Sequence, residues 1–241
     1  MQLKIDIYSV MKNEIVLLPY YLRHYEQFAD RIFIWDDNST DGTRELAAQH
    51  PKVTFLPLHQ KLDNEYMFKI LFMHYRVLSR GIADWVMCVD TDEFIYHPNL
   101  VSVLEKCHIE NKKKIKCKGF TMFASNPPIL NGQIYDEIKI GLPDLLSNKP
   151  VVFDPSVDMN WVYGAHREIY RGNKIRAQED TGIKLFHYRY MGEEYYFKRS
   201  NLSKLNPGWT PQRKHKLPDG SFGEALPWYK LKMKDAVNVV D

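Results

Sequence analysis

Apolar and polar positions repeat with two different periods over the first hundred residues. Short apolar or alternating runs predict strands over residues 3–10, 31–35, 53–56 and 85–89. Longer periodic stretches predict helices over 15–28, from the turn at 38–43 to residue 48, and over 65–80. Repeated strand–helix units predict an α/β fold, in which a mostly parallel sheet carries helices on both faces. Ligands of such sheets bind at the carboxyl ends of the strands.

The second half of the chain is less regular. It predicts helices over 100–111 and 193–201, strands over 115–123, 151–153, 162–170 and 183–190, and a proline- and glycine-rich loop over 207–228. No repeat or low-complexity linker divides the chain. We therefore predict one domain, with an α/β half at about 1–98, an irregular half at about 99–205 that shapes a second site, and a loop-rich tail at 206–241.

Composition narrows the class of protein without naming its function. The chain has 241 residues, of which 44% are hydrophobic and 26% charged, as in ordinary soluble globular proteins. Its 33 basic and 30 acidic residues give a net charge of +3, so no bulk attraction to nucleic acid is expected. Aromatic residues reach 13%, which fits either a large core or a site for ring-shaped ligands.

Three features bear on the compartment. The first residues alternate and include Asp6, which indicates a strand and not a signal peptide, and the longest apolar runs fall far short of the roughly 18 residues of a membrane span. Cys88, Cys107 and Cys117 form no disulfide or zinc pattern, which favours a reducing compartment. We expect a cytoplasmic protein. The lysines at 112–118 indicate either a solvated helix end or a peripheral contact with anionic lipid at the inner membrane face.

An acidic segment, Asp90-Thr91-Asp92-Glu93, directly follows the apolar run Trp85–Val89, which is typical of a strand buried on both faces. In an extended chain, carboxylates at i and i+2 point to the same side and repel each other. A divalent cation such as Mg²⁺ or Mn²⁺, shared with substrate phosphates, relieves that repulsion. The alternative is an acidic turn that caps a following helix. A haloacid-dehalogenase-type phosphohydrolase also has Asp-x-Asp after a strand, but its motif continues differently and usually comes earlier in the chain.

Three segments that follow predicted strands resemble the family 2-like glycosyltransferases of GT-A fold, in particular a bacterial and viral subgroup. They are Met11-Lys12-Asn13-Glu14, Trp35-Asp36-Asp37-Asn38-Ser39-Thr40-Asp41-Gly42-Thr43 and Asp90-Thr91-Asp92-Glu93-Phe94. Leu185-Phe186-His187-Tyr188, followed by Glu193-Glu194 and Lys198, is also similar to that subgroup. The resemblance covers roughly residues 3–200 and implies a single GT-A-type domain, with a Rossmann-like nucleotide-sugar-binding half and an acceptor half.

The resemblance implies roles for residues after the strands. Asp37 would accept a hydrogen bond from the base or ribose, although the Asp36–Asp37 pair also fits an Asx turn. Asn13 and Glu14 would line the same pocket, although Glu14 also fits a helix start. Asp90 would lie toward the ribose and contribute to the metal site, and Asp92 would hold a Mn²⁺ or Mg²⁺ ion that bridges the two phosphates.

The later half supplies further candidates. In GT-A enzymes, a histidine late in the chain often completes the ligands of the metal ion. His187 matches that position best and His166 matches it less well, although either also fits a histidine of the core. Lys149, Arg167 and Lys198 are candidates to hold phosphate oxygens, although a solvated role suits each of them too.

An inverting transferase also needs a carboxylate base to take the acceptor proton, and a retaining one does not. Glu179, Asp180 and Asp158 are the candidates, and a turn explains each of them equally. Trp161, Tyr163, Trp209 and Trp228 are candidates to stack on an acceptor sugar, or else belong to the core.

We therefore expect a metal-dependent glycosyltransferase, and we favour inversion over retention of the configuration at the anomeric carbon. It would move a sugar from a nucleoside-diphosphate donor, UDP-linked in our first hypothesis, to a glycan or glycolipid acceptor in the cytoplasm, or in a host cytoplasm if the protein is viral. Two alternatives stay open. One is a non-catalytic module that binds nucleotide sugars or glycans, and the other is a metal-dependent phosphohydrolase.

Overall fold

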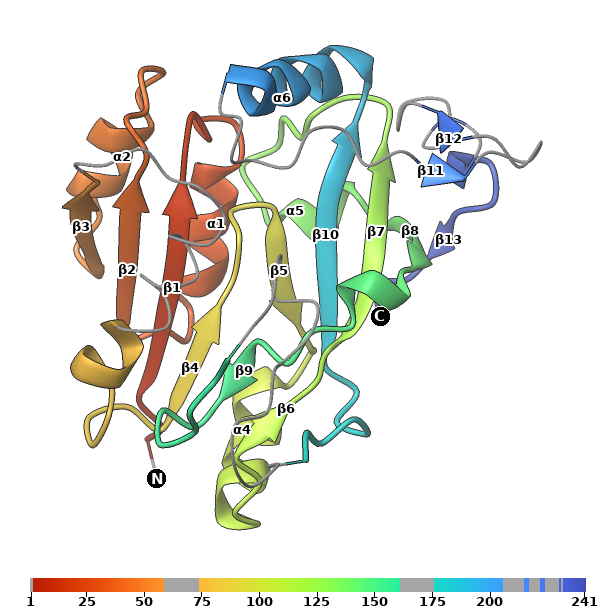
Figure 1. Ribbon diagram of the computed structural model, residues 1–241. Coiled ribbons are helices and arrows are strands. Elements are labelled where there is room, and N and C mark those ends of the chain that lie inside the picture. Colours follow the sequence, from red (N-terminus) through yellow and green to blue (C-terminus); the bar gives the residue numbers. More distant parts are fainter. Residues whose placement is uncertain are drawn as a thin grey trace.

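Two β-sheets form the framework of the protein (Figure 1). The structure is a computed structural model that describes residues 2–58, 74–160, 176–205, 215–216, 222–223, 230 and 232–241. The first sheet has the strand order β3-β2-β1-β4-β9-β6, and the second has the order β13-β8-β7-β10-β5.

Four parallel strands make up most of the first sheet. They are β1 (Ile5–Met11), β2 (Arg31–Asp36), β3 (Val53–Pro57) and β4 (Trp85–Cys88). The helices α1 (Leu18–Tyr25) and α2 (Thr43–Gln49) lie in the connections, and residues 74–78 are helical before β4. The predicted parallel α/β half is confirmed, although the part of the 65–80 helix before residue 74 lies outside the described residues.

The first sheet is buried on both of its faces. On one face, α1 places Leu18, Tyr21 and Tyr25 in a core that also holds Ile7 of β1. On the other face, a second apolar cluster includes Val86 of β4 and Tyr8, whose ring stacks 4.8 Å from that of Phe33. Every residue of β1 and β4 is buried, as the apolar runs predict.

A second sheet occupies the region that we expected to be irregular. Its strands are β5 (Glu93–Tyr96), β7 (Lys118–Ala124), β8 (Ile140–Pro143), β10 (Lys184–Met191) and β13 (Val237–Asn238). Strand β10 pairs with β5 antiparallel and with β7 parallel. Two of these strands, β7 and β10, lie where strands were predicted at 115–123 and 183–190. Their assembly into a sheet was not predicted, because they pair with partners that are distant in sequence.

The remaining elements refine the predicted boundaries. The predicted 115–123 strand is divided, since β6 (Lys114–Ile115) joins β9 (Val152–Phe153) in the first sheet while β7 belongs to the second. The other elements are α4 (Leu100–Ile109), at the predicted 100–111 helix, α5 (Ile134–Glu137), the 3-10 helix η1 (Leu145–Ser147), β11 (His215–Lys216) and β12 (Phe222–Gly223). The predicted 162–170 strand and most of the predicted 207–228 loop lie outside the described residues.

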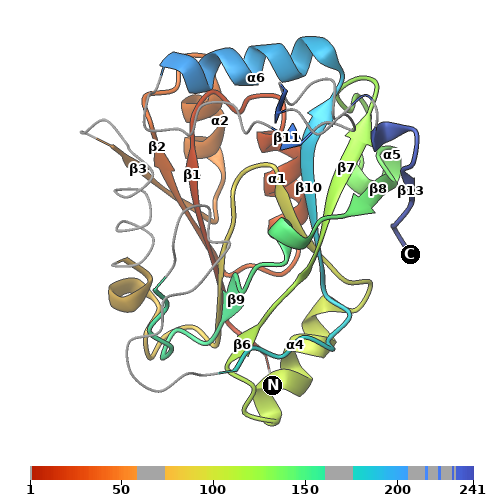
Figure 2. The same ribbon diagram turned by 45° about the vertical axis from the view of Figure 1, so that its right-hand side comes forward.

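Helix α6 (Glu193–Leu205) extends four residues beyond its predicted end. Figure 2 shows it lying across the end of the molecule at which β1, β2 and β10 finish. Side chains of α6 are therefore near the carboxyl ends of the parallel strands, which is where a ligand is expected. Among the described residues, no helix has the length and apolar character needed to cross a membrane.

Candidate functional site: a charged cluster between the two sheets

The acidic segment after β4 is a tight turn that carries the chain from the first sheet into the second. The amide of Glu93 donates to the carbonyl oxygen of Asp90 at 3.0 Å, and β5 begins at Glu93. The chain is therefore not extended from Asp90 to Asp92, and the next element is a strand and not a helix. The expected turn is present, but the expected extended geometry and the expected following helix are wrong, because the chain changes sheets within four residues.

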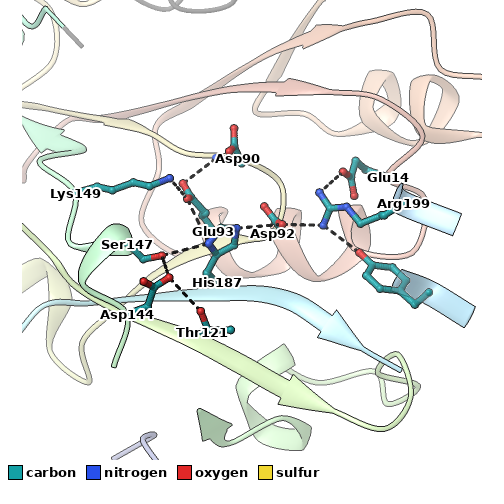
Figure 3. A network of polar contacts seen from close by, with 11 residues as sticks. Glu14, Asp90, Asp92, Glu93, Thr121, Asp144, Ser147, Lys149, His187 and Arg199 are labelled. Atoms are coloured by element: carbon teal, nitrogen blue, oxygen red, sulfur yellow. Dashed lines mark hydrogen bonds and ion pairs between the residues drawn. The ribbon is translucent and has the colours of Figure 1, made fainter. Parts of the chain in front are cut away.

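Glu93 forms a sealed ion pair with Lys149 (Figure 3). The side chains are only 2% and 3% exposed, and Glu93 also accepts a hydrogen bond from the amide of Asp90 at 3.3 Å. Burial alone would raise the pKa of Glu93, but the Lys149 ammonium and then His187 hold that pKa below its ordinary value. Lys149 was expected to hold phosphate oxygens. The structure instead directs its ammonium to Glu93, inside the protein.

Asp92 contacts a guanidinium and an imidazole from the second half of the chain. Its Oδ2 atom lies 2.8 Å from Nη1 of Arg199 on α6 and 3.3 Å from Nε2 of His187 on β10. Burial would raise the pKa of Asp92, but Arg199 and then His187 hold it well below its ordinary range. The structure thus brings Asp92 and His187 together, as the sequence predicts.

Arg199 extends this contact to the first strand. Its Nη2 atom donates to Oε1 of Glu14 at 2.8 Å, and its Nη1 atom lies 3.3 Å from the hydroxyl of Tyr195 (Figure 3). Burial raises the pKa of Glu14 to about 8, against the opposing effect of Arg199, so Glu14 is largely protonated at neutral pH. One guanidinium therefore links the segments that follow β1 and β4 to α6.

Asp90 differs from its neighbours because its side chain is half-buried. Burial, followed by the charge of Glu93, raises the pKa of Asp90 to about 6. Asp92 and Glu93 are accordingly ionised at neutral pH, and Asp90 releases its proton within about one pH unit of neutrality.

His187 is oriented from the side of the second sheet. Its Nδ1 atom lies 3.4 Å from Oγ of Ser147, and Ser147 donates its hydroxyl proton to Asp144 at 2.7 Å. Thr121 of β7 also donates to Asp144, at 3.1 Å. Because Ser147 has one hydroxyl proton and gives it to Asp144, Nδ1 contacts Ser147 as the donor. Gly119 makes the approach of η1 possible, since a Cβ atom there would lie 2.3 Å from the Ser147 carbonyl carbon.

Most polar side chains of the Asp-Asp-x-Ser-x-Asp-Gly-Thr segment bind the loop that follows β1. Ser39 accepts from the amide of Asn13 and Thr43 accepts from the amide of Glu14, both at 2.8 Å. The side-chain oxygen of Asn13 accepts from the amide of Thr40 at 2.7 Å. These bonds fix two adjacent loops at the carboxyl end of the sheet, so the segment has a structural role that does not depend on a ligand.

Asp37 lies at the end of β2, as predicted, but its carboxylate is almost fully buried. It is 2% exposed and lies 3.2 Å from the ammonium of Lys12. Its expected contact with a base or ribose therefore stays a prediction, and the half-buried Lys12 covers part of the carboxylate as its ion-pair partner.

The carboxylates, as they are arranged, do not fit a metal centre. The described residues contain no group of three His, Cys, Asp or Glu side chains that could hold a metal ion. Oδ2 of Asp92 is engaged by Arg199 and His187, and Glu93 is engaged by Lys149. The predicted ligands Asp90, Asp92 and His187 thus share a neighbourhood, in which Arg199 and His187 contact the Asp92 carboxylate. His166 lies outside the described residues.

The expected catalytic bases are not part of this cluster. Glu179 is 62% exposed and pairs with Lys116 at 3.1 Å, and Asp158 is 63% exposed and pairs with Arg76 and Arg80. Figure 1 shows the segment after residue 176 at the opposite end of β10 from α6. Glu179 and Asp180 line a separate cavity of about 560 Å³ there, together with Lys112, Lys113, Lys114 and Arg176. The surface ion pairs of Glu179 and Asp158 explain these two acids without catalysis.

Sequence reasoning missed Arg199, Ser147 and Asp144, which lie in the network. The spacing of Tyr195 and Arg199, four residues apart on a helix, was the available signal for Arg199. The aromatic candidates Trp161, Tyr163, Trp209 and Trp228, and also Arg167, lie outside the described residues. Lys198 is exposed.

Comparison with known proteins gives limited similarity. The sequence matches no family model and no curated protein sequence. Two solved structures are similar to 64% of this chain with a TM-score of 0.42 each. One is S. aureus TarS 1-349, at 15% identity and 47% coverage of that chain, and the other is S. aureus TarS, at 16% identity and 28% coverage. The present chain thus spans less than half the length of either structure.

Proposed function

We propose that the protein is a glycosyltransferase that takes a sugar from a nucleoside-diphosphate donor, with UDP as the expected nucleotide, and transfers it to a glycan or glycolipid. The observation that supports this most is the convergence of Glu14, Asp92, His187 and Arg199. These residues come from the ends of β1 and β4, from β10 and from α6, and form one network. They lie at the carboxyl end of parallel strands, which is the ligand-binding edge of open α/β sheets.

The chemistry of the donor suits this edge. In the transfer, an acceptor hydroxyl oxygen bonds to the anomeric carbon while the bond from that carbon to the diphosphate breaks. The hydroxyl proton leaves, and the nucleoside diphosphate departs with additional negative charge. A guanidinium with unused N–H groups stabilises such an oxyanion through charge-assisted hydrogen bonds. Asp90 begins the same turn, and its half-buried side chain is a candidate to bind a ribose or sugar hydroxyl.

The experiment that tests this proposal is a donor screen with the full chain. UDP-, GDP- and other nucleotide sugars are incubated with glycan and glycolipid acceptors, and nucleotide release is followed together with the mass of the acceptor. We expect a donor to give both nucleotide and a mass increase of one sugar. Asp90→Asn should lower turnover, while Asp158→Asn, at an exposed ion pair far from the cluster, should leave it unchanged.

Two outcomes would replace the proposal with an alternative. Tight binding of a nucleotide sugar without turnover across the panel would indicate a binding module. Release of inorganic phosphate without any acceptor would indicate a phosphohydrolase.

A further inference from the structure

Arg199 holds a position that two carboxyl groups define. Its guanidinium lies between Asp92 and Glu14, with both contacts at 2.8 Å, and the hydroxyl of Tyr195 lies on the same Nη1 atom. The two acids follow different strands of the first sheet, and Arg199 reaches them from a helix 107 residues beyond Asp92. No contact local in sequence produces this arrangement, so the fold of the second half determines it.

The guanidinium also has hydrogen-bonding capacity left over. An arginine side chain has five N–H groups. The contacts with Asp92, Tyr195 and Glu14 use three of them, and in the described part of the chain the remaining two have no protein acceptor. The side chain is 26% exposed, so an external ligand can reach it.

Arg199 is held in place by its two acidic partners. It donates to Asp92 and to Glu14, each at 2.8 Å, and Asp92 also lies 3.3 Å from Nε2 of His187. An incoming phosphate therefore meets a planar donor group that is fixed in place and partly shielded from water, which favours the binding of phosphate by arginine.

We propose that the Arg199 guanidinium binds the diphosphate of the donor, and that it occupies the position at which a divalent ion would otherwise bind Asp92. The first half of this statement rests on the proposed function, and the second half does not. It follows that nucleotide binding is independent of added metal, and that removal of the guanidinium exposes two carboxyl groups to a divalent ion.

The test uses three variants of the full chain. Arg199→Gln removes the charge, Arg199→Lys retains the charge but not the planar guanidinium, and Lys106→Gln removes the charge of an exposed lysine on α4 as the control. Circular dichroism and thermal melting establish that each variant is folded. Binding of UDP is measured by calorimetry in EDTA and again with Mn²⁺, and binding of Mn²⁺ alone is measured from its free-ion magnetic resonance signal.

We expect the wild type and Lys106→Gln to bind UDP in EDTA with affinities within about twofold of those with Mn²⁺. Arg199→Gln should weaken UDP binding by about tenfold or more, the effect of losing charged hydrogen bonds, and Arg199→Lys should lie between. Mn²⁺ alone should bind Arg199→Gln about tenfold more tightly than the wild type, because Asp92 and Glu14 no longer have their cation. If Arg199→Gln is unfolded, the reduced UDP affinity of Arg199→Lys in EDTA serves as the test.

Three results would overturn the inference. Wild-type binding of UDP that requires Mn²⁺ would contradict metal independence, and unchanged UDP affinity in Arg199→Gln would contradict phosphate binding. Equal Mn²⁺ affinities in the wild type and Arg199→Gln would contradict the occupied position. A folded wild type that binds no nucleoside diphosphate in either buffer would overturn the proposed function, and with it the phosphate-binding role of Arg199. The comparison of Mn²⁺ affinities would still show whether Arg199 excludes a divalent ion from Asp92.

Discussion

Two ion pairs begin at adjacent residues of one turn and differ in what surrounds them. Glu93 and Lys149 are both at least 97% buried, and each is matched by the other. Asp92 is equally buried, but its partner Arg199 is 26% exposed and has N–H groups that the described residues do not use. The first pair therefore holds the two sheets together, whereas the second leads from the buried turn to the surface.

The difference shows how a structural charge can be told from a functional one. A pair that is enclosed by the protein cannot be reached by a ligand and is costly to break. A cation that is anchored on one side and open on the other can bind an anion without reorganising. The following predictions separate these two roles, beginning with the largest expected effect on stability.

Lys149→Met should destabilise the protein by about 3–5 kcal/mol, because it leaves Glu93 ionised and buried without a partner. Urea unfolding measures the change, and the double variant Lys149→Met/Glu93→Gln should recover more than half of the loss. Lys116→Met provides the control, since its pair with Glu179 is exposed on the surface. A cost below about 1 kcal/mol for Lys149→Met would mean that the pair is not structural.

Glu14→Gln should change how stability depends on pH. The folded pKa of Glu14 is about 8, above the value of about 4.3 for an unfolded chain, so the folded protein retains a proton that the unfolded chain has released. The contribution of Glu14 is thus fully present below about pH 4 and is lost as the pH rises to about 8.

The glutamine variant keeps the hydrogen bond and lacks this loss. It should therefore gain on the order of 2–4 kcal/mol relative to the wild type between pH 4.5 and 8.5. Parallel unfolding curves at several pH values measure the gain, and a constant difference between the two proteins across this range would refute the raised pKa.

Ser147→Ala should cost about 1 kcal/mol, because Asp144 loses one of its donors and His187 loses the acceptor for Nδ1. The nitrogen chemical shifts of the His187 ring report whether its hydrogen bonds change, which a general loss of packing would not produce. Thr121→Val removes the other side-chain donor to Asp144 without touching His187, and it should leave those shifts unaltered. A shift of equal size in both variants would argue against orientation of the ring by Ser147.

Asp158→Asn should have the smallest effect, below about 1 kcal/mol, since the carboxylate is 63% exposed and pairs with arginines at the surface. Turnover measured beside the wild type should be unaffected. A large loss of turnover would return Asp158 to the list of candidate bases.

The sequence was informative where structure depends on neighbours in the chain. The apolar run at 85–89 predicts a buried strand, and the rule that ligands bind at strand ends directs attention to Asp92 and to Glu14, which both contact Arg199. Local patterns do not contain the partners of these acids. Lys149 lies 56 residues from Glu93, and Arg199 lies 185 residues from Glu14. The second sheet was missed for the same reason, because β10 pairs with β5 and β7 across long connections.

The central claim is that the turn after β4 belongs to a nucleotide-sugar site, and the turnover of Asp92→Asn tests it most directly. Asparagine keeps the shape of the side chain and removes the charge that Arg199 and His187 share. With the donor identified in the screen, we predict a fall in kcat/KM of about 100-fold or more, equivalent to about 2.7 kcal/mol, in a variant whose circular dichroism matches the wild type. Undiminished kcat/KM in that folded variant would contradict the claim.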